Sequence, residues 1–235
     1  MHYALIDWDN TLHRGYTIYG LADHLVEQQL VSGQLLLVFK ELEHQYLAGT
    51  LPYADYTERT CASFAKALAG CSFADYVDAV RSYRPLNEAG LFPDAYRLFQ
   101  LLNKYGIRTY LVSGAPLDLL ETYRDQLGLR DIFAFQLKTA HGRITGQVAQ
   151  NYGLNKERIL RHASFQSLDS VHLLSMGDAV ADIPLLNNSL IPIVVGKHDL
   201  TLRPELTPIR FTRQEWNLEL VEERIRQVIE QPINH

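Results

Sequence analysis

Two pairs of acidic residues, far apart in the chain, are the groups with the clearest potential for chemistry. Asp7 and Asp9 lie two residues apart at the end of an apolar run, and Asp178 and Asp182 lie four apart after another. Grouped carboxylates suit a hard divalent cation such as Mg²⁺, which also binds phosphate oxygens. Each pair has a structural alternative, because aspartate often ends a strand or begins a helix.

Two further segments offer groups that could bind an anion. Ser113-Gly114 follows an apolar run and supplies a hydroxyl and open backbone N–H groups before an expected helix, which suits phosphate oxygens. Lys156 stands at the opening of another expected helix. Taken singly, the serine is also an ordinary helix cap and the lysine an ordinary surface charge.

Short apolar runs that end at small or polar residues predict four buried strands, at residues 3–6, 109–112, 171–176 and 191–195. Helical patterns at residues 95–105, 117–127 and 156–165 lie around the second and third of them. This alternation predicts an α/β fold, a three-layer Rossmann-like parallel sheet covered by helices. Ligands bind at the carboxyl ends of such strands, where the polar groups above are found.

The interval between the first two expected strands breaks this alternation. It spans about 100 residues, whereas a simple crossover needs about a dozen or more. Its pattern is helical, with interruptions expected at Pro52, at residues 70–72 and at Pro85. We therefore expect an all-helical cap domain of residues 15–88, inserted into a core of residues 1–14 and 89–235. Residues 133–148 alternate around His141-Gly142 and predict an antiparallel hairpin.

The composition narrows the classes of function. With 22 basic and 27 acidic residues among 235, the net charge of −5 gives no electrostatic reason to expect nucleic acid or an anionic membrane as partner. No stretch of about 18 apolar residues indicates a membrane span. The two cysteines argue against a disulfide scaffold or a zinc site, and with no secretory signal in view we expect a cytoplasmic protein.

In their order along the chain, these segments resemble the motifs of the haloacid dehalogenase superfamily, specifically the phosphatase branch with a helical cap after the first motif. Phosphoserine phosphatase belongs to that branch. The family's four motifs are matched, in order, by Asp7, Asp9 and Thr11; by Ser113; by Lys156; and by Gly177, Asp178 and Asp182.

The resemblance implies a magnesium-dependent phosphatase. Asp7 is then the nucleophile that forms an aspartyl-phosphate, and Asp9 is the acid and base. Because a dehalogenase needs no such acid, Asp9 favours phosphoryl transfer over dehalogenation. The implied ligands are Asp7, Asp9 (through its backbone carbonyl) and Asp178 for the metal; Ser113, Gly114 and Lys156 for the phosphate; and Thr11 and Asp182 in support.

We expect a small phosphorylated metabolite as substrate, and one other than phosphoserine. Phosphoserine phosphatases carry a glutamate shortly after the first motif, where this chain has no acid. Arg59 stays open as a cap arginine or an exposed helix residue. The expected cap is rich in tyrosines that fit a stacking pocket or a core: Tyr16, Tyr19, Tyr46, Tyr53, Tyr56, Tyr76 and Tyr83. The alternatives are a catalytically idle relative that binds a phosphorylated ligand or a partner protein, and a phosphotransferase.

Overall fold

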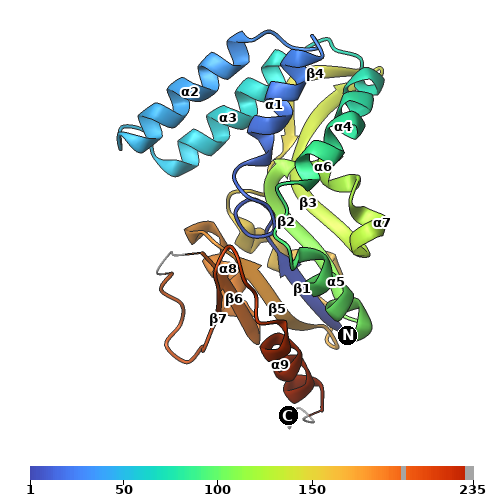
Figure 1. Cartoon of the computed structure of the whole chain (residues 1–235), viewed down its shortest axis with the longest axis vertical. Coiled ribbons are helices and arrows are strands. Elements are labelled where there is room, and N and C mark those ends of the chain that lie inside the picture. Colours follow the sequence, from blue (N-terminus) through green and yellow to red (C-terminus); the bar gives the residue numbers. More distant parts are fainter. Residues whose placement is uncertain (197–199, 231–235) are drawn as a thin grey trace.

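A seven-stranded sheet in the order β4-β3-β2-β1-β5-β6-β7 forms the centre of the computed structural model, which describes residues 1–196 and 200–230 (Figure 1). Neighbouring strands are parallel except for the antiparallel β3 and β4. The parallel sheet confirms the predicted fold class, and the four expected strands are β1, β2, β5 and β6. The strands are β1 (His2–Ile6), β2 (Arg108–Pro116), β3 (Leu129–Ala140), β4 (Arg143–Gln150), β5 (Val171–Gly177), β6 (Ile191–Val195) and β7 (Ile209–Phe211).

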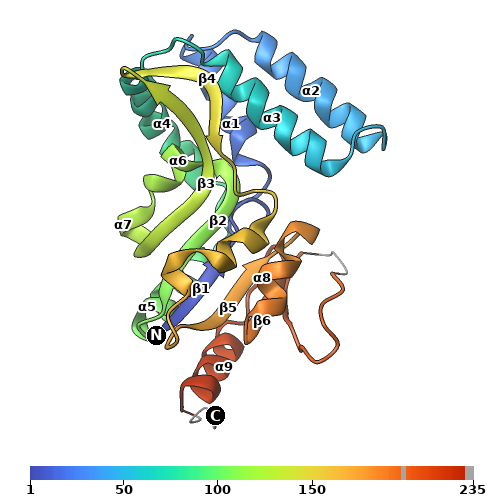
Figure 2. The ribbon, with the colours of Figure 1, turned by 180° about the vertical axis from the view of Figure 1, so that it is seen from behind.

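Helices cover both faces of this sheet (Figure 1, Figure 2). One face packs against α5 (Ala95–Lys104), α6 (Leu117–Glu121), α7 (Arg124–Leu127) and α9 (Leu218–Glu230). The other face packs against two short 3₁₀ helices, η1 (Lys156–Arg161) and η2 (Ala163–Phe165), and against α8 (Ile183–Asn188), which follows the 3₁₀ turn η3 (Val180–Asp182). The result is the three-layer arrangement that the alternating pattern predicts.

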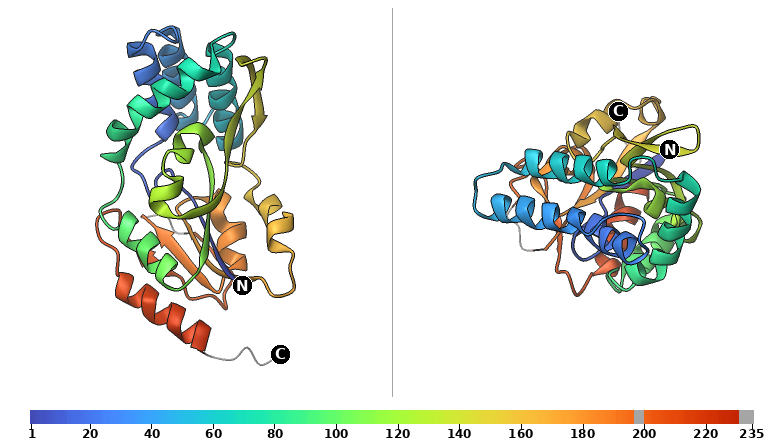
Figure 3. Two further views of the ribbon diagram at one scale, coloured as in Figure 1. Left: turned by 90° about the vertical axis from the view of Figure 1, so that its right-hand side faces the viewer. Right: turned by 90° about the horizontal axis from the view of Figure 1, so that it is seen from above.

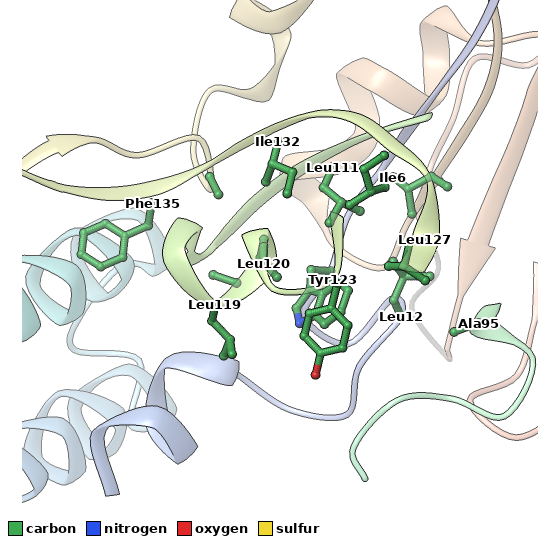
Figure 4. Close-up of a cluster of buried hydrophobic side chains, with 14 of the residues drawn as sticks. Ile6, Leu12, Ala95, Leu111, Leu119, Leu120, Tyr123, Leu127, Ile132 and Phe135 are labelled. Atoms are coloured by element: carbon green, nitrogen blue, oxygen red, sulfur yellow. The ribbon is translucent and has the colours of Figure 1, made fainter. Parts of the chain in front are cut away.

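The alternation of side chains along β1 explains why both faces need cover. Ala4 and Ile6 enter the larger apolar cluster, whereas Tyr3 and Leu5 enter a second cluster on the opposite face. Figure 4 shows Ile6 within the larger cluster, close to side chains that come from β2, β3 and the segment after β2. Full burial of a leucine or isoleucine side chain such as Leu5 or Ile6 contributes about 1.5–3 kcal/mol to folding.

Five helices separate β1 from β2, and the first four of them lie together at one end of the molecule (Figure 1, Figure 3). They are α1 (Thr17–Glu27), α2 (Gln34–Leu47), α3 (Tyr53–Ala67) and α4 (Phe73–Glu88). Pro52 precedes α3 as expected, but the interruption predicted at Pro85 is wrong, because α4 continues to Glu88. Tertiary bonds hold that last turn: the Asn87 side chain donates to the Tyr123 hydroxyl at 3.0 Å, and the Asn87 carbonyl lies 3.0 Å from His13 Nε2.

The predicted hairpin is confirmed as β3 and β4, joined at His141-Gly142. Both turn residues have positive φ, 52° and 74°, as a two-residue type I′ turn requires. The tip of the hairpin bonds to the loop between α3 and α4, where the Gly70 N–H donates to the Ile144 carbonyl at 2.8 Å. The hairpin therefore ties the inserted helices to the sheet at a point distant from the chain connections.

None of the helices within the described residues combines the length and the apolar character that crossing a bilayer requires.

Candidate active site

The sheet order brings the two acidic pairs together. β1 lies beside β5, so Asp7 and Asp178 emerge next to one another at the carboxyl edge, and the Asp7 N–H donates to the Met176 carbonyl at 3.0 Å. Asp7, Asp178 and Asp182 each contribute a carboxylate oxygen to a group within which all separations are under 4.8 Å. The three side chains are almost completely buried, which makes this an enclosed group of carboxylates.

Lys156 is the buried cation of this cluster. It follows Asn155, whose left-handed backbone (φ 54°) turns the chain towards the sheet edge. Its Nζ lies 2.7 Å from Asp7 Oδ1 and 2.7 Å from Asp182 Oδ1. Burial alone would lower the pKa of Lys156, but the carboxylates of Asp182 and Asp7 outweigh it and raise the pKa. The lysine is therefore a permanent positive charge.

The loop after β1 places Thr11 against both acidic pairs. The backbone N–H groups of Thr11, Leu12 and His13 all point at the Trp8 carbonyl, at 2.8–3.2 Å, so the loop is tight. The Thr11 hydroxyl donates to Asp7 Oδ2 at 3.1 Å and lies 3.5 Å from Asp178 Oδ1. Thr11 thus contacts Asp7 and Asp178, and its supporting role stays a prediction.

Asp9 lies outside the group of three carboxylates and is bonded to the start of α1. Its Oδ1 accepts a hydrogen bond from the Thr17 N–H at 2.9 Å and another from the Thr17 hydroxyl, which in turn accepts the Trp8 indole N–H at 3.0 Å. Burial raises the pKa of Asp9 to about 7, although the Thr17 bonds act in the opposite direction. A carboxyl group with this pKa is suited to give and take a proton near neutral pH.

Ser113 and Gly114 reach the same cavity from the end of β2. The Ser113 side chain is completely buried, and its Oγ accepts the Ala115 N–H at 3.2 Å. Gly114 packs backbone to backbone against Gly153 of the loop before Lys156, and a Cβ on Gly153 would lie 2.7 Å from the Gly114 Cα. Only glycine permits this approach, which joins the serine loop to the lysine loop.

Gly177 and Asp182 explain the spacing of the second acidic pair. A Cβ on Gly177 would lie 2.4 Å from the Asp182 Cβ, so Asp182 folds back over the glycine. Asp182 Oδ2 accepts the backbone N–H groups of Asp178 at 3.1 Å and of Ala179 at 3.0 Å. The four-residue spacing thus lets Asp182 hold the turn that presents Asp178 while its other oxygen binds Lys156.

The charges of the cluster do not balance. Burial raises the pKa of both Asp7 and Asp178, neighbouring carboxylates raise it further, and Lys156 opposes the shift. Among the described residues, Lys156 is the one buried lysine beside three carboxylates, and an excess of negative charge on oxygen ligands fits a hard divalent cation.

Arg213 is a charged residue of the site that sequence reasoning missed. It lies shortly after β7, lines the cavity, and its guanidinium lies 3.4 Å from Asp178 Oδ2. No sequence signal indicates it, because an arginine in a loop is usually solvated. The sheet order decides its position, since β7 and β6 extend the sheet on the β5 side.

A cavity of about 840 Å³ lies between the cluster and the inserted helices. All of the sequence-predicted site residues except Thr11 line it, and Thr11 lies completely buried behind Asp7. Arg59 is exposed and is not among the lining residues. Of the seven tyrosines named above, Tyr76 and Tyr83 are buried in the core, whereas five line the cavity: Tyr16, Tyr19, Tyr46, Tyr53 and Tyr56.

Comparison with known proteins gives matches over most of the chain. A model of the haloacid dehalogenase-like hydrolase family matches residues 4–187. A phosphoserine phosphatase of Streptomyces coelicolor is 32% identical over 117 residues, which are 48% of this chain and 27% of that protein. The chain thus spans about a quarter of the length of this curated relative.

Solved structures share the fold. A HAD family hydrolase from Salmonella enterica serovar Typhi has a TM-score of 0.64 at 15% identity, covering 93% of this chain and 70% of the other. A phosphoserine phosphatase determined as a phospho-aspartyl intermediate analogue has a TM-score of 0.58 at 18% identity. The match covers 94% of this chain and 98% of the other. The structures show the shared fold, and the family model over residues 4–187 confirms the resemblance that the four motifs indicate.

Proposed function

Because the chain belongs to the haloacid dehalogenase-like hydrolase family, we propose that it is a magnesium-dependent phosphomonoesterase that acts through an aspartyl-phosphate on a small phosphorylated metabolite. The observation that carries this proposal is the buried group of three carboxylates and one lysine beneath a cavity. The inserted residues 15–88 act as a cap that limits the size of the substrate and excludes water from the first step.

The donor set fits Mg²⁺. The carboxylates of Asp7 and Asp178, with the backbone carbonyl of Asp9, would hold the ion, and Asp182 would keep Asp178 and Lys156 in place. When bound, Mg²⁺ supplies positive charge that offsets the repulsion between the phosphate dianion and the nucleophile. The unbalanced negative charge of the cluster is the feature that supports this assignment.

The reaction proceeds in two steps on this chain's residues. A carboxylate oxygen of Asp7 attacks phosphorus, the bond from phosphorus to the alcohol oxygen breaks, and Asp9 gives its proton to the departing oxygen. Asp9, now ionised, takes a proton from water as the water oxygen attacks phosphorus, and the bond to Asp7 breaks to release phosphate. Its pKa of about 7 suits both transfers.

The remaining residues bind the transferring phosphoryl group. The Ser113 hydroxyl and the Gly114 N–H hold phosphoryl oxygens from the end of β2. The ammonium group of Lys156 offsets the negative charge of the phosphoryl group. We propose that the substrate is not phosphoserine, because among the described cavity residues the inserted helices contribute no basic side chain to pair with its carboxylate.

The test is phosphate release from a panel of phosphomonoesters with Mg²⁺. We expect hydrolysis by the wild type, and loss of at least 1,000-fold with EDTA or in Asp7→Asn, because the nucleophile and the charge neutralisation are removed. Asp125→Asn is the matched control, since Asp125 is exposed on α7, and it should keep full activity. Full activity in Asp7→Asn would exclude the covalent route.

A second experiment separates the two steps. Asp9→Asn should still be phosphorylated by p-nitrophenyl phosphate, whose leaving group needs no proton, but should release phosphate slowly. The phosphoenzyme should therefore accumulate in Asp9→Asn and be detectable as a mass increase on the intact protein. Equal accumulation in wild type and variant would argue against Asp9 as the base.

A further inference from the structure

Five tyrosines of the inserted residues 15–88 line the cavity, and we call them the tyrosine wall: Tyr16, Tyr19, Tyr46, Tyr53 and Tyr56. We propose that the tyrosine wall binds an alkylammonium group on the alcohol part of the substrate, so that the enzyme prefers cationic phosphomonoesters. This inference rests on the proposed phosphomonoesterase function and names the class of leaving group.

The rings of the wall hold one another in place. Tyr46 stacks on Tyr56 with ring centroids 4.8 Å apart and planes within 9°, and Tyr16 meets Tyr56 edge to face at 6.5 Å. The ring centroids of Tyr53 and Tyr46 lie 5.8 Å apart, and the hydroxyls of Tyr19 and Tyr56 form a hydrogen bond with each other. The wall is therefore a pre-arranged aromatic surface with faces in several orientations.

Two of these rings lie next to the reaction centre. Burial raises the pKa of Tyr53 to about 12, and the Asp7 carboxylate is the next cause of that shift. The pKa of Tyr16 is raised in the same way, with Asp178 among the contributing charges. Both rings line the same cavity as Asp7 and Asp178, so an alcohol attached to a phosphate at the carboxylate cluster extends into a space that these rings border.

The charge of the cavity favours a cation over an anion or a neutral group. Among the described residues, five acidic and two basic side chains line it, and with Asp9 carrying the proton that it gives to the departing oxygen, the other six ionised groups leave a net charge of −2. Both basic groups pair with carboxylates of the cluster, Lys156 with Asp7 and Arg213 with Asp178. The charges of a bound Mg²⁺ and a phosphate dianion cancel each other. The excess negative charge of the cavity therefore attracts a positive charge on the leaving group.

Tyrosine faces provide the matching local interaction. The negative face of an aromatic ring attracts an ammonium group within about 6 Å of its centroid, most strongly where water is excluded. Tyr56 is buried and Tyr46 and Tyr53 are partly buried, so a cation held against these rings is partly removed from water. A neutral aromatic group would gain packing against the same rings but no charge attraction.

The decisive comparison uses two substrates of equal shape. Phosphocholine carries a quaternary ammonium, and 3,3-dimethylbutyl phosphate replaces its nitrogen by carbon. We expect kcat/KM for phosphocholine to exceed that for the carbon isostere by about tenfold or more. Equal values, or a preference for phenyl phosphate or O-phosphoserine over phosphocholine, would overturn the proposal.

Substitutions test whether the wall is responsible. Tyr53→Leu, which removes the ring, should reduce the ratio of the two kcat/KM values about threefold or more, whereas Tyr53→Phe, which keeps the ring face, should preserve it. Tyr105→Leu is the control, because Tyr105 lies outside the cavity beside Glu222. An unchanged ratio in Tyr53→Leu and in Tyr16→Leu would contradict the assignment.

Failure of the function is distinguishable from failure of this inference. Hydrolysis of p-nitrophenyl phosphate that Asp7→Asn abolishes establishes the phosphomonoesterase whatever the preferred leaving group. If no ester is hydrolysed, calorimetric titration of phosphocholine and its isostere into the Mg²⁺-loaded wild type still tests whether the tyrosine wall binds a cation. Tighter binding of phosphocholine, weakened in Tyr53→Leu, supports the cation site, and equal or absent binding refutes it.

Discussion

Replacing Lys156 with methionine should greatly destabilise the metal-free protein. The substitution keeps an unbranched apolar stem but removes an ammonium that lies 2.7 Å from both Asp7 and Asp182. The three carboxylates of the cluster then face one another without a buried cation, and Asp178 already has a raised pKa because of burial and its neighbours. These side chains are almost completely buried, and their slight exposure to the cavity gives them little solvation by water.

The magnitude follows from the burial of the pair. Removing one partner of a buried, hydrogen-bonded ion pair costs about 3–5 kcal/mol, because the other charge stays desolvated. We expect that loss in the free energy of unfolding of Lys156→Met at pH 7.5. It should shrink at lower pH, where the carboxylates take up protons, and with saturating Mg²⁺, which supplies the missing positive charge.

Urea unfolding followed by circular dichroism measures the effect, with EDTA and with Mg²⁺. Lys104→Met is the matched control: Lys104 makes a contact of similar length, 2.8 Å to Glu222, but the lysine is exposed, and the variant should unfold at nearly the wild-type urea concentration. If metal-free Lys156→Met unfolds at the same urea concentration as Lys104→Met, the account of the cluster as an enclosed set of unbalanced charges is refuted.

Three other changes probe separate parts of the structure. Gly153→Ala should lower kcat/KM about 100-fold in phosphate-release assays, because the new Cβ would lie 2.7 Å from the Gly114 Cα and displace the segment that carries Ser113 and Gly114. Thr17→Val should lower kcat about tenfold for alkyl phosphates, with a smaller loss for p-nitrophenyl phosphate, because Asp9 loses a donor. Burial lowers the pKa of His172 from 6.5 to about 4, so the unfolded chain binds the proton first. The contribution of His172 to stability should fall by about 1.4 kcal/mol per pH unit from pH 6.5 towards 4, measured in urea unfolding as the difference in slope between the wild type and His172→Gln.

Local patterns were sufficient for much of the fold. The apolar run at the N-terminus predicts β1 because alternate side chains of a buried strand enter two cores, and the hairpin turn at His141-Gly142 is encoded by two residues that accept positive φ. The interruption predicted at Pro85 is wrong, because the tendency of proline to end a helix is weaker than the tertiary bonds that hold the following turn at Asn87. The contact between the hairpin and the inserted helices has no local signal.

The amino-acid sequence alone determined which groups are available for catalysis and at which ends of the strands they stand, because strand polarity and spacing are local properties. Tertiary structure alone decided their partners: Lys156 lies between Asp7 and Asp182, and Arg213 reaches Asp178. It also decided which tyrosines line the cavity and which lie in the core. Distances, burial and the charge balance that shifts a pKa depend on neighbours that are remote in the chain, and only folding brings these together.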